Sequence, residues 1–260
     1  MGRNEARCPR WVLPCWTAPV HPAAVITLHT MPGTDKLESF SPFCMKVEVY
    51  LKLQELPYKI APGDPRKAPK GKLPIVDVDS ARIADSSAII AYLEGKASVP
   101  LDRGLDAAER ARAHVLKRMF EESLYFVLLW SRWADDEGWA ELRPAVEALV
   151  PAAVRWFVPG IIRKKIVAST VAQGTGRHTR DEVYALGKAD IEAVATLLGD
   201  RPYFLGDELR TIDVIAYSFL ANILLWTKPS PLTEAARALP TLDAYVKRIG
   251  SRLEASAKAA

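Results

Sequence analysis

The chain has 260 residues, of which 49% are hydrophobic and 25% are charged, a composition typical of a soluble globular protein with one large or two small domains. Its formal net charge is only +4, and the densest basic cluster is Arg163-Lys164-Lys165. A nucleic-acid binder concentrates its cations on one face, so this thin spread predicts no nucleic-acid partner, and the cluster is interpreted as a solvated helix end.

The number and spacing of the cysteines and histidines indicate which cellular compartment and which metal sites to expect. Cys8, Cys15 and Cys44 form no disulfide framework, which favours a reducing compartment, and the cytoplasm is the expected location. The four histidines are scattered, and none pairs with another ligand at metal-binding spacing, so no metal site is predicted. No apolar run reaches the ~20 residues of a membrane-spanning helix, so no transmembrane segment is predicted.

Strands and helices alternate in the first part of the chain. Residues 1–23 lack periodicity and are interpreted as a flexible extension, and residues 24–96 have the element order of a thioredoxin-like α/β domain. The order predicts one parallel strand pair joined by a helix and one antiparallel hairpin at Asp79-Ser80, hence a mixed four-stranded sheet. The expected strands are residues 24–29, 58–60, 73–78 and 82–84, and the expected helices are residues 42–55 and a segment capped by Asp85 that ends near Glu94.

The rest of the chain has helical periodicity. Residues 97–105 are interpreted as a linker, and residues 106–260 are expected to form an all-helical C-terminal domain. The expected helices are residues 107–133, 139–158 (kinked or divided by Pro151), 180–198, 211–225 and an exposed last helix at 242–253. Gly174 to Arg177 is too far from any strand to be a nucleotide loop, and it is interpreted as a turn between helices.

The segment Ser41-Pro42-Phe43-Cys44 lies between a strand and a helix. A helix N-terminus offers free N–H groups and partial positive charge, which stabilise a thiolate. The spacing matches the Cys-x-x-Cys of thioredoxins, with Ser in place of the first Cys. Two-cysteine redox cycling is therefore excluded, and the motif favours binding another molecule's thiol. The alternatives are that Ser41 is only a helix cap, or that Cys44 packs inward or reacts itself.

Two further segments offer backbone and charged contacts. Lys72-Leu73-Pro74 precedes a strand opposite the motif, and a cis Pro74 there would expose backbone groups that pair with a peptide ligand. Asp85-Ser86 opens a helix, where N–H groups and a hydroxyl bind a carboxylate and Asp85 binds an ammonium. The alternative is again a simple helix cap.

Together, these segments provide sites for a thiolate, a peptide backbone and an α-amino acid, which are the three parts of glutathione. The first domain resembles glutathione transferases, and Ser41-Pro-Phe is similar to the serine-type motif of the plant tau class. The resemblance implies that Ser41 activates the glutathione sulfur, with Cys44 as the alternative catalytic group. It also implies that Lys72 meets the glycine carboxylate, that Leu73 with Pro74 pairs with the cysteinyl backbone, and that Asp85 and Ser86 hold the γ-glutamyl end.

Longer stretches resemble a narrower group, the failed-axon-connections, cadmium-responsive and metaxin-like family. They include Ser41-Pro-Phe-Cys-Met-Lys-Val-Glu-Val-Tyr-Leu, Met119-Phe-Glu-Glu-Ser-Leu-Tyr, Gln173-Gly-Thr-Gly-Arg-His and Leu198-Gly-Asp-Arg-Pro-Tyr-Phe-Leu-Gly. The match covers roughly residues 25–225. One departure lies at the buried helix, where transferases usually carry Ser or Thr three residues before an Asp. Here Arg210 stands three residues before Asp213, and Thr211 is a candidate cap instead.

The resemblance leaves three functions open. The first is a glutathione-dependent transferase acting on a hydrophobic electrophile, with an aromatic acceptor pocket that includes Tyr125 and Trp130. The second is a non-catalytic transferase-like scaffold, and the third is a thiol transferase based on Cys44. Dimerisation is common in the transferase fold, so the resemblance allows a homodimer.

Overall fold

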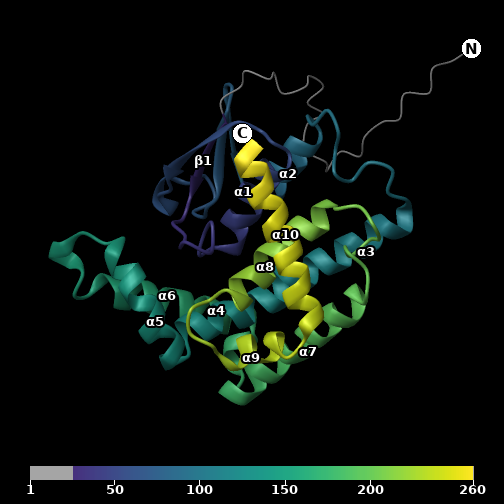
Figure 1. Ribbon diagram of the computed structural model, residues 1–260. Helices are drawn as coiled ribbons and strands as arrows, with labels where there is room; N and C mark the ends of the chain where they lie inside the picture. The colour runs from purple at the N-terminus through teal and green to yellow at the C-terminus, as the bar shows by residue number, and fades with distance from the viewer. Residues whose placement is uncertain (1–25, 260) are drawn as a thin grey trace, which may run out of the picture.

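The first domain is a mixed four-stranded sheet covered by helices α1 (Pro42–Leu53) and α2 (Ser86–Glu94) (Figure 1). The computed structural model describes residues 26–259, so the predicted extension at residues 1–23 lies outside the described residues. The strand order is β2-β1-β3-β4, with β1 parallel to β2 and antiparallel to β3, and β3 antiparallel to β4. The strands are β1 (Ile26–Thr30), β2 (Tyr58–Pro62), β3 (Ile75–Val78) and β4 (Ala81–Ala84).

This arrangement confirms the predicted thioredoxin-like sheet, and the helices that follow confirm the predicted α-helical second part. In chain order they are α3 (Ala107–Arg118), η2 (Met119–Leu124), α4 (Tyr125–Trp133), α5 (Asp136–Ala148), η3 (Ala152–Val154), α6 (Val158–Gln173), η4 (Thr175–Arg177), α7 (Arg180–Leu198), α8 (Thr211–Leu224), α9 (Pro231–Arg237) and α10 (Pro240–Ala259). A short 3₁₀ turn, η1 (Pro65–Lys67), lies in the first domain.

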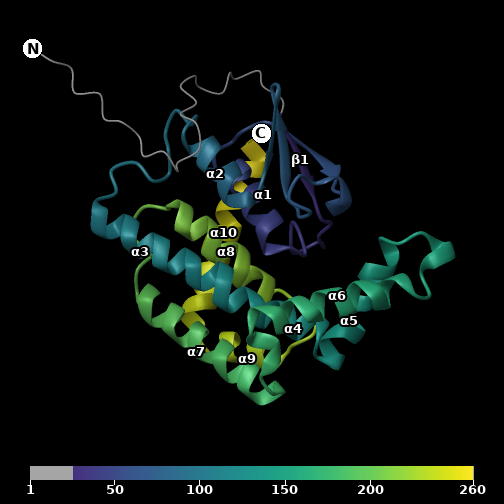
Figure 2. The same cartoon turned by 180° about the vertical axis from the view of Figure 1, so that it is seen from behind.

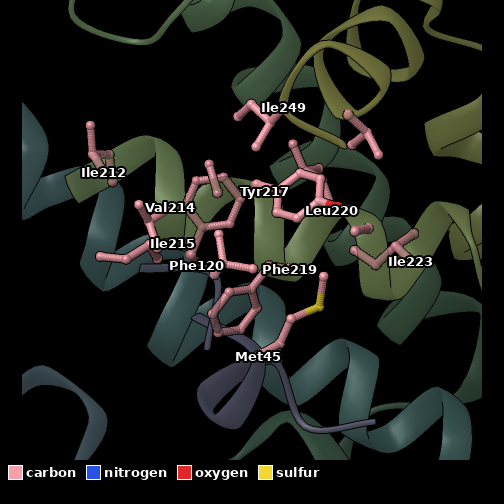
Figure 3. Packing of buried hydrophobic residues seen from close by; sticks show 14 of the residues in the cluster. Met45, Phe120, Ile212, Val214, Ile215, Tyr217, Phe219, Leu220, Ile223 and Ile249 are labelled. Atoms are coloured by element: carbon pink, nitrogen blue, oxygen red, sulfur yellow. The ribbon is translucent and has the colours of Figure 1, made fainter. Parts of the chain in front are cut away.

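Helix α8 is the centre of the second domain. Every residue from Ile212 to Leu224 is buried. The helix carries apolar side chains on all of its faces, as expected for a helix surrounded by other elements. Helix α1 packs against it across the two domains. Figure 3 shows Met45 of α1 pointing to Phe219 of α8, with Phe120 beside them. One hydrophobic core therefore joins the sheet domain to the helices.

Three helical predictions need correction. The predicted helix at 139–158 is divided at Pro151, one of the two outcomes expected, but its bounds are wrong, because α5 is Asp136–Ala148 and the chain reverses before α6. Helix α6 was missed since Val158-Pro159-Gly160 reads as a break, although proline suits the first turn of a helix. The short helix α9 was also missed. The last helix was expected to be exposed, but α10 buries Tyr245 and Ile249 in the core.

The predicted helix at 107–133 is continuous in direction but contains a π turn. Helices α3 and α4 are joined by η2, whose wider turn includes Glu121 and Glu122. Such π turns occur frequently at functional sites, since they shift side chains relative to a regular helix. Here the turn buries Glu121 and leaves Glu122 exposed.

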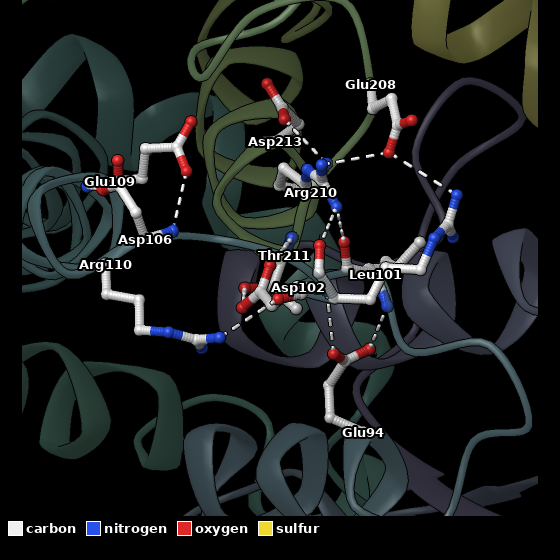
Figure 4. A network of polar contacts seen from close by, with 11 residues as sticks. Glu94, Leu101, Asp102, Asp106, Glu109, Arg110, Glu208, Arg210, Thr211 and Asp213 are labelled. Atoms are coloured by element: carbon white, nitrogen blue, oxygen red, sulfur yellow. Dashed lines mark hydrogen bonds and ion pairs between the residues drawn. The ribbon is translucent and has the colours of Figure 1, made fainter.

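The hydrogen bonds at the N-terminus of α8 show how this helix is capped although Arg210 stands where transferases usually carry Ser or Thr (Figure 4). The Asp213 carboxylate accepts a hydrogen bond from the backbone N–H of Arg210 at 2.9 Å. It also accepts from the backbone N–H of Phe204 at 2.9 Å. Asp102 supplies the missing cap, because its carboxylate accepts from both the N–H (2.9 Å) and the hydroxyl (2.6 Å) of Thr211. Thr211 therefore does not cap the helix with its own side chain. The Arg210 guanidinium instead donates to the carbonyl of Leu101 at 2.7 Å.

Candidate functional site

Ser41 is the N-cap residue of α1. It has extended backbone angles (φ −96°, ψ 116°), and its hydroxyl oxygen accepts a hydrogen bond from the Cys44 N–H at 3.4 Å. That bond is long, so the hydroxyl is only weakly held by the helix. The side chain is half-exposed and Pro42 follows at the first helical position. The hydroxyl can therefore turn toward a ligand at the helix N-terminus, where the helix dipole favours negative charge.

Cys44 is fully buried in the first turn of the same helix. Burial raises the pKa of its thiol, and hydrogen bonds from the Met31 backbone and from the side chains of Thr30 and Ser41 counter that rise only in part. These contacts place the sulfur against the end of β1. A buried thiol with a raised pKa is a poor nucleophile.

The Leu73-Pro74 peptide bond is cis, as predicted. Pro74 is buried immediately before β3, Leu73 is half-buried and Lys72 is exposed. This segment and Ser41 belong to the same sheet domain, on loops that precede β3 and α1 respectively.

Asp85 is the N-cap of α2 and has a left-handed φ of 88°. A positive φ is unusual for a residue with a side chain and costs on the order of 1–3 kcal/mol, and such residues cluster at active sites and ligand clamps. One carboxylate oxygen accepts from the N–H groups of Ser87 (2.9 Å) and Ala88 (3.2 Å), and the other lies 3.8 Å from Lys70 Nζ. Ser86 follows and is buried at the start of the helix.

Lys46 connects the two helix starts and was missed by sequence reasoning. It is completely buried on α1, where its ammonium donates to Ser87 Oγ at 3.3 Å and forms an ion pair with Glu121 of η2. Desolvation lowers the pKa of Lys46, while Glu121 acts in the opposite direction. The sequence offered little signal, because Lys46 is one of three charged residues on α1, with Glu48 and Lys52. The pair links α1, the start of α2 and the second domain beside Asp85.

Tyr125, one of the two residues predicted for the acceptor pocket, lies next to the first turn of α1. Its ring centroid is 4.7 Å from that of Phe43, and no residue in the described range hydrogen-bonds its hydroxyl. Burial first, and then the nearby Cys44, raise the pKa of Tyr125 to about 12, so the hydroxyl stays protonated and can donate. Trp130 is not brought together with Tyr125: it packs edge-on against Tyr184 of α7, with centroids 5.7 Å apart.

Arg132 of α4 is a second charged group that the sequence did not reveal. It is buried, and it donates to the carbonyl of Phe40, the residue before Ser41, at 2.8 Å and to the carbonyl of Asn222 at 2.6 Å. Its guanidinium lies 3.8 Å from the ring centroid of Trp226, and burial lowers its pKa to about 9. No carboxylate in residues 26–259 pairs with it at ion-pair distance. Arg132 thus places a cation beside the chain that leads into Ser41.

Three further sequence predictions concern the turn at residues 174–177, membrane-spanning helices and metal sites. In the predicted turn, Gly174 ends α6 and Thr175–Arg177 form η4, which packs back on α6, where Arg177 donates to the carbonyl of Val171 at 2.9 Å. Among residues 26–259, no helix is both long enough and apolar enough to cross a bilayer. In the same part of the chain, no group of three or more His, Cys, Asp or Glu side chains is arranged to hold a metal ion.

Known protein families match both parts of the chain. The glutathione S-transferase N-terminal domain matches residues 42–138, and the glutathione S-transferase C-terminal domain matches residues 187–249. The isoprene-epoxide–glutathione S-transferase of Rhodococcus sp. (strain AD45) is 32% identical over 221 residues, which cover 82% of this chain and 92% of that protein. The chain belongs to the glutathione S-transferase family.

Within this family, the relatives include the failed-axon-connections and metaxin-like proteins that the sequence motifs indicated. Failed axon connections of Drosophila melanogaster is 30% identical over 86% of this chain and 57% of its own length. Metaxin-1 of Homo sapiens is 25% identical over 87% of this chain and 51% of its own length. Among solved structures, the β-etherase LigF of Sphingobium sp. strain SYK-6 has a TM-score of 0.62 at 15% identity, covering 90% of this chain and 99% of LigF. That similarity supports the fold alone.

Proposed function

We propose that this protein binds glutathione and directs its thiolate at a small hydrophobic electrophile, such as an epoxide, in the cytoplasm. The observation that carries the proposal is the position of Ser41, which is half-exposed and weakly hydrogen-bonded at the N-terminus of α1, whereas Cys44 is fully buried in the first turn of the same helix. The similar Rhodococcus protein, by its name, joins glutathione to an isoprene epoxide.

In the proposed complex, each part of glutathione has its own partner. Lys72 meets the glycine carboxylate, Leu73 and cis Pro74 present backbone groups to the cysteinyl residue, and Asp85 with Ser86 holds the γ-glutamyl end. The glutathione sulfur lies over the first turn of α1, where the Ser41 hydroxyl donates a hydrogen bond to it. The helix dipole and the nearby Arg132 charge favour the thiolate, because both place positive potential at this point.

The proposed reaction is a nucleophilic substitution or ring opening. The glutathione thiol first loses its proton to water, and the thiolate then forms a carbon–sulfur bond. For an epoxide, one carbon–oxygen bond breaks at the same time, and the resulting alkoxide takes up a proton. In this proposal Tyr125 donates that proton, which is supported by its protonated hydroxyl and by the absence of a hydrogen-bond partner for that hydroxyl among residues 26–259. Catalysis is then mainly electrostatic and positional.

Replacement of Ser41 separates this function from its alternatives. Ser41→Ala is expected to lower kcat/KM with an epoxide by about 10²-fold, the typical effect of removing one donor to a developing anion. Cys44→Ala should keep most of the rate, and iodoacetamide should label Cys44 slowly in the native protein, because the thiol is buried. Ser80→Ala, in the exposed β3–β4 turn, is the matched control and should leave the rate unchanged.

Two outcomes would replace the proposal. Loss of activity in Cys44→Ala together with rapid labelling of Cys44 near neutral pH would indicate a thiol enzyme. No detectable rate with any electrophile, in a wild-type protein that is folded, would indicate a scaffold.

A further inference from the structure

The α5–α6 hairpin projects from the body of the molecule. Figures 1 and 2, which view the chain from opposite sides, both show α5 and α6 running out beyond the other helices, with the connecting segment at the far end. Helix α5 ends at Ala148 and α6 begins at Val158, with the 3₁₀ turn η3 between them. The part of this projection considered below, the hairpin tip, is residues 149–165.

The hairpin tip exposes large apolar side chains that folding normally buries. The exposed fraction is 81% for Trp156, 59% for Ile161, 51% for Leu149 and 37% for Phe157. The Trp156 and Phe157 rings pack against each other, with centroids 4.6 Å apart, rather than against the core. Single exposed apolar residues need no explanation, but several within one projecting turn indicate a surface that contacts another body.

The charge of the hairpin tip is of one sign. It carries Arg155, Arg163, Lys164 and Lys165, and no Asp or Glu occurs between Glu147 and Asp181. Arg163 is engaged with Asp136 (2.7 Å), whereas Lys164 and Lys165 are exposed and have no ion-pair partner in the described part of the chain. The exposed apolar surface is therefore accompanied by cations that no protein carboxylate neutralises.

The apolar and basic groups are ordered along the hairpin. Ile161, Lys164 and Lys165 are spaced i, i+3 and i+4, so they share one face of α6, with the two lysines about one turn (~5.4 Å) behind the apolar end. Segments that lie in a membrane interface bury their apolar groups about 5–10 Å deep, with aromatic rings and lysines at the level of the headgroups. The order of side chains on the hairpin tip matches that profile.

We infer that the hairpin tip is a docking surface for an anionic lipid bilayer. Trp156, Phe157 and Ile161 enter the interface, and Lys164 and Lys165 pair with negatively charged headgroups. Charge complementarity favours this occupant over a second copy of the chain, because two identical basic tips repel each other and each chain carries a net charge of +4. Docking is independent of glutathione binding, and it brings the site to where apolar electrophiles dissolve.

Sedimentation with vesicles tests this inference on the full chain. The protein should sediment with vesicles of equal parts phosphatidylcholine and phosphatidylserine, and much less with phosphatidylcholine alone or at high salt. The double variant Lys164→Glu/Lys165→Glu, and separately Trp156→Ser, should each weaken binding at least about ten-fold. The matched control is Lys36→Glu/Lys59→Glu, which makes the same charge change at exposed positions of the first domain and should reduce binding less.

Circular dichroism should show all variants folded, since the altered side chains are exposed. Absence of sedimentation with the mixed vesicles, or equal loss in the two double variants, would overturn the inference. Concentration-dependent dimerisation that Trp156→Ser abolishes, without vesicle binding, would show that a second copy covers the hairpin tip instead.

Discussion

Replacing Glu121 by Ala is expected to lower the free energy of unfolding by about 3–5 kcal/mol, because the change leaves the Lys46 ammonium buried without its counter-ion. Lys46 is completely buried, and its other polar contact in the structure is Ser87 Oγ at 3.3 Å. A neutral hydroxyl does not compensate the desolvation of an ammonium. The effect should be large because the pair also connects α1 to η2, and therefore the two domains.

Urea denaturation of matched variants measures this effect. Glu122→Ala is the control, since Glu122 is the next residue of the same π turn but is exposed and paired only with Arg118 across one helical turn. Its expected cost is under about 1 kcal/mol. The double variant Lys46→Met/Glu121→Leu removes both charges and should recover much of the lost stability. A cost for Glu121→Ala no greater than that of the control would contradict the assigned ion pair.

Replacing Asp213 by Ala is the second large effect expected, at about 3 kcal/mol or more. The carboxylate is fully buried and accepts from the N–H groups of Phe204 and Arg210 and from the hydroxyl of Tyr245, at 2.9, 2.9 and 3.0 Å. Alanine leaves the N–H groups of Phe204 and Arg210 unpaired, while the Tyr245 hydroxyl keeps its 3.2 Å contact with the backbone carbonyl of residue 213. Each unsatisfied buried group costs about 1–3 kcal/mol. Because α8 is the centre of the core, the loss should appear as a lower stability of the whole protein.

Thermal and urea unfolding of Asp213→Ala and Asp243→Ala provide the comparison. Asp243 also lies in the first turn of a helix, α10, but its side chain is half-exposed and forms an ion pair with Lys247. Its replacement should cost under about 1 kcal/mol. Asp213→Asn should be intermediate, since its single oxygen satisfies some of the donors while its amide group faces the others. Equal stability of the Asp213 and Asp243 alanine variants would refute the role of Asp213.

Local signals explain what the sequence could predict. The sheet, the first helix and the cis Pro74 follow from β-branched runs, a Ser-Pro helix start and a proline before a strand, all within a few residues. Helix α7 was also predicted within its observed bounds, because Thr179 caps it and Gly199 ends it. Where a short segment carries its own start and stop signals, hydrophobic periodicity is enough to predict the element and its bounds.

Contacts between distant segments explain what was missed. Lys46 and Glu121 are 75 residues apart, and Arg132 meets Asn222 from 90 residues away. Neither of these contacts produces a pattern that can be recognised in a single sequence. The cap of α8 was misjudged for the same reason, since Asp102 reaches Thr211 from the segment between the domains. Helix α6 was lost because Pro159 and Gly160 resemble a break when their helical neighbours are not seen.

The most direct measurement is a calorimetric titration of the full chain with glutathione. We expect saturable heat with one glutathione bound per chain at concentrations of about 1 mM or below, within the usual range of enzyme substrates. Ser86→Ala should weaken binding about ten-fold, as loss of a hydrogen bond to a charged group does. Ser80→Ala should not change it. Absence of any binding heat at millimolar glutathione, from wild-type protein shown to be folded, would contradict the proposed function.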